Sequence, residues 1–264
     1  MNRLLDYLAE THQPYLHAKG EAATELLLKW LDCRPGENVL EFGVGTGGTL
    51  VKVAAGYRQT RLWGVDISDK MLRKAGKRLM FCGLFKKVIL QKTNGRHLET
   101  FADNFFDKIY IESVLGIQED ATLTGLLAEF GRILKPKGKL VLNETLWLES
   151  TDAETIARFN EFVKQNFGII QANAAYPYLK DWMALLRASH FEVVKTQEAD
   201  TVIAERRPLN FREKLSTLFT LSGSIYGKMF LRRSFRQFAE ATASTPFNRP
   251  VMAGYLIMAS CTKP

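Results

Sequence analysis

The order of apolar and polar positions along the chain predicts alternating strands and helices. Short apolar runs, typical of buried strands, recur at residues 39–42, 61–66, 87–90, 107–112, 191–194 and 252–259, with a further run after a turn at residues 135–138. A helical pattern follows the first run at residues 49–55, and others begin near residues 153 and 179. This alternation is typical of an α/β protein, in which a mainly parallel sheet carries helices on both faces.

Two segments outside this alternation are expected to be helical additions. Residues 1–33 predict two helices joined by a polar and aromatic loop, in which Pro14 and Gly20 break the helical pattern. Residues 205–249 place apolar residues at helical spacing, and Gly223 and Gly227 are expected to divide this segment into two helices. We therefore expect a single domain over residues 1–264, with an N-terminal helical cap and a helical insertion before the last strand.

The first apolar run leads into a glycine-rich loop and then into the helical pattern. Glycines let the backbone approach a ligand closely, and a strand–loop–helix unit of this kind binds nucleotide-like ligands. Gly43, Gly45 and Gly48 match the dinucleotide fingerprint, but that match alone is weak. Glu41 favours a different ligand, because a carboxylate repels a pyrophosphate and attracts an ammonium group. The loop therefore predicts a ligand with an ammonium group and no phosphate, bound near Glu41 and approached closely by the backbone at Gly43, Gly45 and Gly47.

A second acidic residue, Asp66, ends the next apolar run about twenty residues after the glycines. At this position a carboxylate can accept hydrogen bonds from both ribose hydroxyls of an adenosine. The other interpretation is a helix N-cap, a role that Ser68 can fill instead. Ile67 and Met71 follow in the same segment and are candidate cofactor contacts. Met71, with Leu72, can pack against the adenine, and ordinary core packing is the alternative.

Polar residues also follow the third and fourth runs. Asn94 and Gly95 come after the third run, and Glu112 ends the fourth. Ligands bind at the carboxyl ends of parallel strands, so these residues are expected to line the same crevice as Asp66. Asn-Gly is also a common turn pair, which is the alternative role for Asn94 and Gly95.

A second signature occupies residues 130–142, where a helix is expected to end before Pro136 and a Lys-Pro-Lys-Gly turn to reverse the chain into a strand. Together with the glycine loop, it closely resembles class I S-adenosylmethionine-dependent methyltransferases, especially those acting on quinones, sterols and other lipid-like acceptors. The resemblance spans about residues 36–145. It implies a Rossmann-like, seven-stranded, mostly parallel sheet with an antiparallel last strand, S-adenosylmethionine as cofactor, and an adenine contact from Asn94.

The resemblance also implies that the N-terminal segment covers the active site. Tyr15 and His17 are therefore candidate acceptor contacts, and Tyr178, which precedes a predicted helix, is a third. Some relatives carry a histidine after the fourth strand, whereas residues 115–118 here read Leu-Gly-Ile-Gln. No catalytic residue is identified. The expected reaction is methyl transfer to an oxygen, carbon or nitrogen atom of a small, apolar acceptor.

Composition adds information on location and partners. The chain has 264 residues, a net charge of +8 and three widely spaced cysteines, a pattern that predicts neither disulfides nor a zinc site. No metal-ligand spacing occurs elsewhere. With no signal peptide and no apolar run long enough to cross a bilayer, the pattern favours the cytoplasm.

The excess positive charge is concentrated near the end of the chain. Between Glu205 and Gln237, eight Lys and Arg residues accompany two Glu and are interleaved with aromatic residues. This basic-aromatic segment is either a packed insertion with a solvated basic face or an apolar lid that contacts an anionic membrane peripherally. Nucleic-acid binding ranks below both interpretations, because no recognised binding module accompanies the charge.

Two functions outside methyl transfer stay open. The chain can be a cofactor-binding scaffold or partner subunit without catalysis, although the intact glycine loop and Asp66 argue against it. It can also be a nicotinamide oxidoreductase, against which Glu41 and the Lys-Pro-Lys-Gly turn argue.

Overall fold

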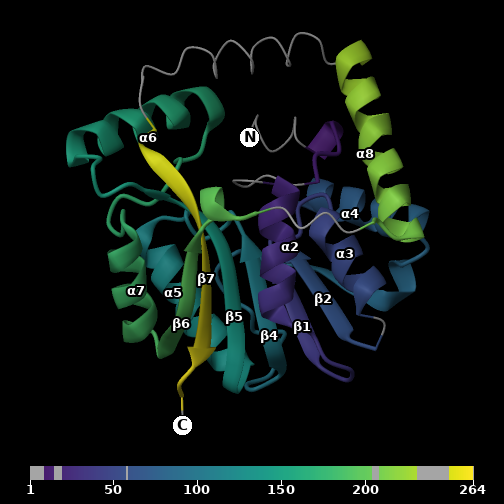
Figure 1. The fold of residues 1–264 in the computed structure, drawn as a ribbon, viewed down its shortest axis with the longest axis horizontal. Helices are drawn as coiled ribbons and strands as arrows, with labels where there is room; N and C mark the ends of the chain where they lie inside the picture. Colours follow the sequence, from purple (N-terminus) through teal and green to yellow (C-terminus); the bar gives the residue numbers. More distant parts are fainter. Residues whose placement is uncertain (1–8, 15–19, 58, 204–207, 231–249, 264) are drawn as a thin grey trace.

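A computed structural model describes residues 9–14, 20–57, 59–203, 208–230 and 250–263, and a single seven-stranded sheet runs through them (Figure 1). The strands are β1 (Asn38–Phe42), β2 (Arg61–Asp66), β3 (Val88–Lys92), β4 (Phe106–Glu112), β5 (Leu134–Trp147), β6 (Phe191–Glu198) and β7 (Met252–Cys261). They lie in the order β3-β2-β1-β4-β5-β7-β6. β7 pairs antiparallel with β5 and β6, and the other neighbouring pairs are parallel. The predicted α/β fold and its antiparallel last strand are confirmed.

Helices cover both faces of this sheet, as expected. α2 (Gly20–Leu31), α3 (Gly48–Gly56) and α4 (Asp69–Phe81) share one apolar core with the sheet, and α5 (Asp120–Ile133) and α7 (Leu179–Ala188) share another. Side chains alternate between the two faces along a strand. Val39 accordingly belongs to the core with α2, whereas Leu40 and Phe42 belong to the core with α5.

The remaining elements lie around this three-layered centre. Two short 3-10 helices, η1 (Phe85–Lys87) and η2 (Ala199–Thr201), connect larger elements. α6 (Ala153–Phe167) is preceded by Asp152, whose side chain accepts a hydrogen bond from the Thr155 amide. Asp152 is therefore the N-cap of α6, and the hydroxyl of the preceding Thr151 donates to the Val251 carbonyl. α8 (Phe211–Phe230) packs against α3 and α4.

The Lys-Pro-Lys-Gly sequence lies within a strand, which differs from the prediction. α5 ends at Ile133 and β5 begins at the next residue, so the sequence is not a connecting turn. The pairing with β4 shifts register here, because Phe106 pairs with Leu134 while Lys108 pairs with Lys139. The extra β5 residues form a bulge in which Lys137 has a φ of +63°.

α8 is one continuous helix, so the prediction that Gly223 and Gly227 break it is wrong. Both glycines are buried and face the N-terminal segment. A Cβ atom at Gly223 would lie 2.4 Å from the His12 ring, and one at Gly227 would lie 2.6 Å from Thr11. The glycines therefore permit a close approach of two segments, which compensates for their low helix propensity.

Several predicted features fall outside the described residues. Among them are the first N-terminal helix, the acceptor candidates Tyr15 and His17, and most of the arginines of the basic-aromatic segment. The second predicted N-terminal helix is α2. None of the described helices combines the length and the apolar character needed to span a bilayer.

Candidate functional site

The glycine-rich loop joins β1 to α3 at the carboxyl end of the sheet. Gly43, Gly45 and Gly47 have φ values of +84°, +50° and +80°, which residues with a Cβ rarely adopt. A Cβ at Gly43 would lie 2.3 Å from Val114, and one at Gly47 would lie 3.1 Å from Ala75. At Gly45, by contrast, a Cβ would meet no atom within 4 Å. The loop thus packs against protein on two sides and leaves open space at Gly45.

Asp66 holds this loop from the end of β2. Its Oδ2 accepts a hydrogen bond from the Gly45 amide at 2.9 Å, and its Oδ1 accepts one from the Ser68 amide at 2.8 Å. Burial raises the pKa of the Asp66 carboxyl, and the backbone hydrogen bonds oppose that shift. Ser68 itself caps α4, because its hydroxyl accepts from the Met71 amide. Asp66 is therefore free of the capping role and lies beside the open space at Gly45.

The other adenine-side candidates divide into two groups. Ile67 is exposed and lies against Gly95, where a Cβ would be 2.8 Å from the Ile67 side chain. Met71 is buried in contact with the protein interior. The Asn94 side-chain oxygen accepts from the amides of Arg96 and His97, both at 2.9 Å. The structure therefore brings Ile67 and Gly95 together near Asp66, while Asn94 stabilises its own turn.

Glu41 is buried in the sheet, whereas the sequence predicts an ionised carboxylate facing the ligand. The Tyr110 hydroxyl donates to Glu41 Oε2 at 2.5 Å across the β1–β4 pair. Burial raises the pKa of Glu41 well above its usual value, and the nearby Glu112 and Asp66 charges raise it further. Without a cationic ligand, the carboxyl therefore favours its protonated form.

We expect this buried acid to couple cofactor binding to proton release. A bound sulfonium or ammonium group favours the Glu41 carboxylate, so affinity should rise with pH until the raised pKa of the free protein is passed. Calorimetry in buffers of different ionisation enthalpy measures the released protons. Glu41→Gln, which removes the titrating group and keeps a hydrogen-bond acceptor for Tyr110, should abolish this dependence. An unchanged pH dependence in that variant would assign it to another group.

Glu112 is the last residue of β4, and its carboxylate accepts hydrogen bonds from side chains of neighbouring elements. It accepts hydrogen bonds from the Thr49 hydroxyl of α3 at 2.7 Å and the Thr24 hydroxyl of α2 at 2.9 Å. The Asn143 amide group of β5 donates to it at 3.3 Å. These partners hold three elements together below the loop that follows β4. The arrangement gives Glu112 a positioning role in this structure.

Sequence reasoning missed Glu144, which organises the loop after β4. This buried side chain accepts hydrogen bonds from three successive amides, those of Val114, Leu115 and Gly116, at distances of 2.9 to 3.1 Å. Ser113, at the start of this loop, has a φ of +53°. A carboxylate bound by several amides fixes a loop strongly. The available signal was an acid within an apolar strand whose neighbours are Asn143 and Thr145.

Sequence reasoning also missed Arg78, a fully buried arginine of α4. Its guanidinium donates to the Thr46 carbonyl of the glycine loop at 2.8 Å and to the His12 carbonyl at 2.7 Å. It also donates to Ser216 and Thr220 of α8, both hydroxyls at 2.9 Å. Arg78 thus joins the glycine loop, the N-terminal segment and α8. The sequence signal for its burial was the helical spacing. Arg78 lies seven residues, or two helical turns, after the buried Met71, so both lie on the same side of α4.

Tyr178 lies at the start of α7, where its hydroxyl donates to the Thr151 carbonyl at 2.7 Å. Its ring packs against the apolar cluster that contains Trp147 and Phe159. These contacts give the side chain a structural role, and the acceptor role stays a prediction.

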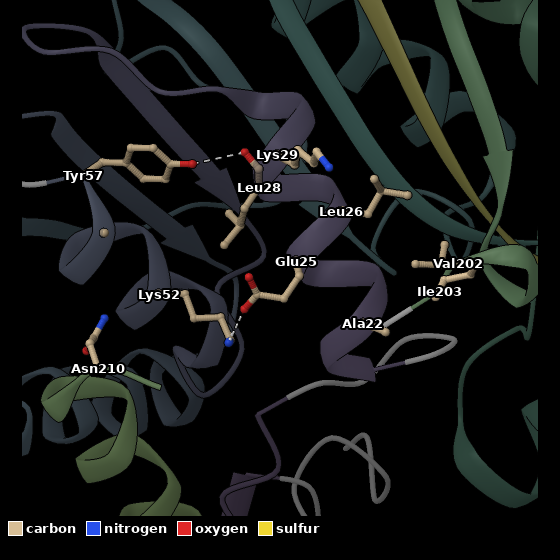
Figure 2. Close-up of a pocket in the computed structure, with 11 residues that line it drawn as sticks. Ala22, Glu25, Leu26, Leu28, Lys29, Lys52, Tyr57, Val202, Ile203 and Asn210 are labelled. Carbon is tan, nitrogen blue, oxygen red and sulfur yellow. Dashed lines mark hydrogen bonds and ion pairs between the residues drawn. The ribbon is translucent and has the colours of Figure 1, made fainter. Parts of the chain in front are cut away.

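The cavity shown in Figure 2 lies apart from the glycine loop. It has a volume of about 450 Å³ and lies between α2, the end of α3 and three residues further along the chain, Val202, Ile203 and Asn210. Lys52 projects beside it and forms ion pairs with Glu25 at 2.5 Å and Glu21 at 2.7 Å. None of the predicted cofactor residues lines this cavity. Most of those residues lie instead in the glycine loop and at the ends of the parallel strands.

Sheet order, glycine loop and Asp66 together define a Rossmann-like protein, in which nucleotide-type ligands bind at the carboxyl ends of the parallel strands. Residues 39–138 match a family model described as a methyltransferase domain. A demethylmenaquinone methyltransferase of Tropheryma whipplei is 35% identical over 116 residues, which cover 44% of this chain and 45% of that protein. The chain thus spans about half the length of that curated relative.

Two further comparisons extend over more of the chain. An uncharacterised protein of Haemophilus influenzae is 26% identical over 209 residues, or 79% of each chain. The structure of phosphoethanolamine N-methyltransferase 2 of Haemonchus contortus superposes with a TM-score of 0.70 at 17% identity, covering 98% of this chain and 57% of that one. The latter likeness shows the fold.

Residues 39–138 therefore match a methyltransferase domain, and S-adenosylmethionine is the cofactor consistent with that match. The residues present fit that cofactor. No protein atom lies within 4 Å of a Cβ placed at Gly45, and the buried Asp66 carboxylate, which could accept from ribose hydroxyls, lies next to this space. The described residues contain no cluster of three or more His, Cys, Asp or Glu that could hold a metal ion.

Proposed function

We propose that this methyltransferase acts on a small, apolar acceptor of the quinol or phenol type. The observation that supports this proposal most directly is the wall next to the glycine loop. The Val114 side chain packs over Gly43, and the loop that carries it is held rigidly by Glu144. An apolar group at this position favours an acceptor with an apolar ring. The name of the Tropheryma relative indicates a quinone-type acceptor for that protein.

The residues of this chain support the reaction by positioning. The cofactor supplies an activated methyl group whose departure leaves a neutral sulfur. Asp66, which already fixes the Gly45 amide, and the loop amides would hold the adenosine side, and Glu144 would fix the wall on the acceptor side. Aligning two reactants in this way can contribute up to about 7–11 kcal/mol to catalysis. A phenol or quinol can ionise in solution, so its reaction does not require a strong base from the protein.

A phosphorylated amine is the second acceptor class, because the superposed Haemonchus structure contains phosphomonomethylethanolamine. Such a ligand needs accessible cations to hold its phosphate. On α4, Lys70 and Lys74 are paired with Glu10, and Arg78 is buried. None of these three cations is therefore placed as an open phosphate ligand, which favours the apolar acceptor.

The test measures methyl transfer to both acceptor classes in parallel. Purified protein is incubated with methyl-labelled S-adenosylmethionine and either a short-chain demethylmenaquinol or phosphoethanolamine. We expect label in the organic extract of the first reaction and none on the amine. Gly45→Val, which fills the open space of the loop, provides the inactive control.

Three other outcomes would contradict the proposal. Label on phosphoethanolamine alone would show that the acceptor is a phosphorylated amine and not a quinol or phenol. Tight cofactor binding with no transfer to either acceptor or to a metabolite extract would favour a scaffold role. Calorimetric binding of NAD in place of S-adenosylmethionine would favour an oxidoreductase.

A further inference from the structure

α8 presents an apolar stripe on the side that faces away from the protein. The stripe consists of Phe211, Leu218, Leu221, Ile225 and Met229, which are between 51% and 74% exposed. These residues recur at intervals of three, four and seven, so they share one side of the helix. The opposite side is buried against the protein and includes Glu213, Ser216, Gly223 and Gly227. Large apolar side chains therefore cover the solvent side of a helix that is already packed on its other side.

The apolar surface continues from α8 onto α4 and η1. Met80, Phe81 and Phe85 are each about half exposed. Met80, Phe81 and Phe211 line a common groove between the two helices, and the rings of Phe81 and Phe219 lie 6.0 Å apart. Met80 and Phe85 line a second groove next to it. We call this surface, made of Met80, Phe81, Phe85 and the five stripe residues of α8, the α4–α8 face.

Basic residues surround the α4–α8 face. Residues 70–92 contain eight Lys and Arg and no acidic residue. Those with exposed side chains include Arg73, Lys77, Lys86 and Lys87, and the exposed Lys214 lies within the stripe itself. Arg73 and Lys77 line the same groove as Met80 and Phe85. Apolar and cationic side chains are therefore interleaved on one surface.

The nearby carboxylates do not neutralise these exposed cations. Asp69, at the start of α4, forms an ion pair with Lys92 at 2.5 Å. Glu213, the only acid of α8, is buried, accepts from the Asn210 amide and lies 3.8 Å from the buried Lys52. The net charge that the face offers to a partner is positive.

We propose that the α4–α8 face docks on the surface of an anionic lipid bilayer. Helices that lie in the membrane interface combine an apolar side rich in Phe and Leu with flanking Lys and Arg, as this face does. A second copy of this chain fits less well, because the cores of protein–protein interfaces are depleted in Lys. Nucleic acid fits less well too, since Leu221, Ile225 and Met229 offer no contact to phosphates.

This orientation agrees with the position of the glycine loop. In Figure 1, α8 stands at the edge of the molecule and its last turns extend past the carboxyl ends of the parallel strands. A bilayer along α8 would lie beside the carboxyl ends of the parallel strands, where the glycine loop follows β1. The inference does not rest on the acceptor class, because docking is measured without turnover.

The experiment is co-sedimentation of the full chain with vesicles of phosphatidylcholine alone or with phosphatidylserine added. We expect binding to the anionic vesicles, weaker binding to the neutral ones, and release by salt. Two double variants test the face: Leu221→Ser with Ile225→Ser, and Lys86→Gln with Lys87→Gln. Each should lower the partition coefficient by about tenfold, since each removes part of the apolar or electrostatic attraction.

Matched controls use exposed residues outside the face. Val194→Ser with Ile203→Ser removes exposed apolar groups, and Lys137→Gln with Lys164→Gln removes exposed charge. Both controls should bind like the parent chain. Absent binding to anionic vesicles, or equal losses in test and control variants, would overturn the proposal. A dimer in ultracentrifugation that the Leu221 and Ile225 changes dissociate would overturn it in favour of a self-association surface.

Discussion

Asp66→Ala should weaken S-adenosylmethionine binding by about 2–3 kcal/mol, the range for hydrogen bonds to a charged group. This corresponds to a roughly 30- to 150-fold increase in Kd. Two effects contribute. The cofactor loses a charged acceptor, and the amides of Gly45 and Ser68 lose the carboxylate that fixes them. Because the Gly45 amide belongs to the glycine loop, the substitution acts on the cradle as well as on the ligand.

Asp66→Asn provides a second test with nearly the same volume. Its amide group presents a donor where the carboxylate accepted from backbone amides, so it should lose affinity without creating a cavity. Asp69→Ala is the matched control, because Asp69 is three residues further on and pairs with Lys92 at the exposed surface. Pairs of this kind contribute little to stability. Affinity is measured by calorimetry and folding by circular dichroism. Parental affinity in both folded Asp66 variants would show that Asp66 is not a cofactor ligand.

The sheet was the most predictable part of the structure. Buried strands appear in the sequence as short apolar runs, and β2 has the bounds that the pattern predicts. The start and end of β5 were less predictable. Its bulge at Lys137 depends on pairing with β4, which is a contact between distant parts of the chain. Local sequence around Pro136 and Gly138 resembles a turn in either case.

The continuity of α8 shows the same limit. Gly223 and Gly227 have low helix propensity, and local reasoning breaks the helix there. In the structure they allow contact with His12 and Thr11, more than two hundred residues away in the chain. That approach brings the N-terminal segment against α8. Tertiary contact thus decides the role of these glycines.

The candidate site divides along similar lines. Gly45 and Asp66 were predictable from the glycine motif and the acid that follows it about twenty residues later. That spacing reflects the positive φ of Gly45 and the hydrogen bond from its amide to Asp66. Glu144 was not, since its partners are amides of a loop about thirty residues earlier in the chain. Glu41 was identified, but its state was not, because burial and the Tyr110 hydroxyl decide its protonation. Sequence locates a charged residue more readily than it locates what surrounds it.

Arg78→Met should have the largest effect on stability, because this residue joins three segments that have little other connection in sequence. The buried guanidinium donates to carbonyl groups of Thr46 and His12 and to hydroxyl groups of Ser216 and Thr220. It also lies 5.0 Å from the centre of the Phe219 ring. Methionine fills much of the volume but leaves these buried acceptors without a donor. We expect the free energy of unfolding to fall by about 3 kcal/mol.

The substitution should also weaken cofactor binding, since the Thr46 carbonyl that Arg78 holds belongs to the glycine loop. Arg78→Lys keeps a charge but offers three donors from one point, so it cannot reach all the partners of the planar guanidinium. It should fall between the parent and Arg78→Met in both stability and affinity. Arg73→Met, on the exposed side of the same helix, is the matched control and should change stability by less than about 0.5 kcal/mol.

Urea unfolding, calorimetry with S-adenosylmethionine and limited proteolysis together test this role. If Arg78 docks α8 onto the glycine loop, then Arg78→Met should speed cleavage within residues 208–230 while the far side of the sheet stays protected. Bound cofactor should slow that cleavage, because ordering the loop restores part of the surface on which α8 packs. Uniform destabilisation with unchanged affinity and no preferential cleavage of α8 would show that Arg78 only fills the core. Preferential cleavage together with lost affinity would show that the insertion and the cofactor loop are coupled through one side chain.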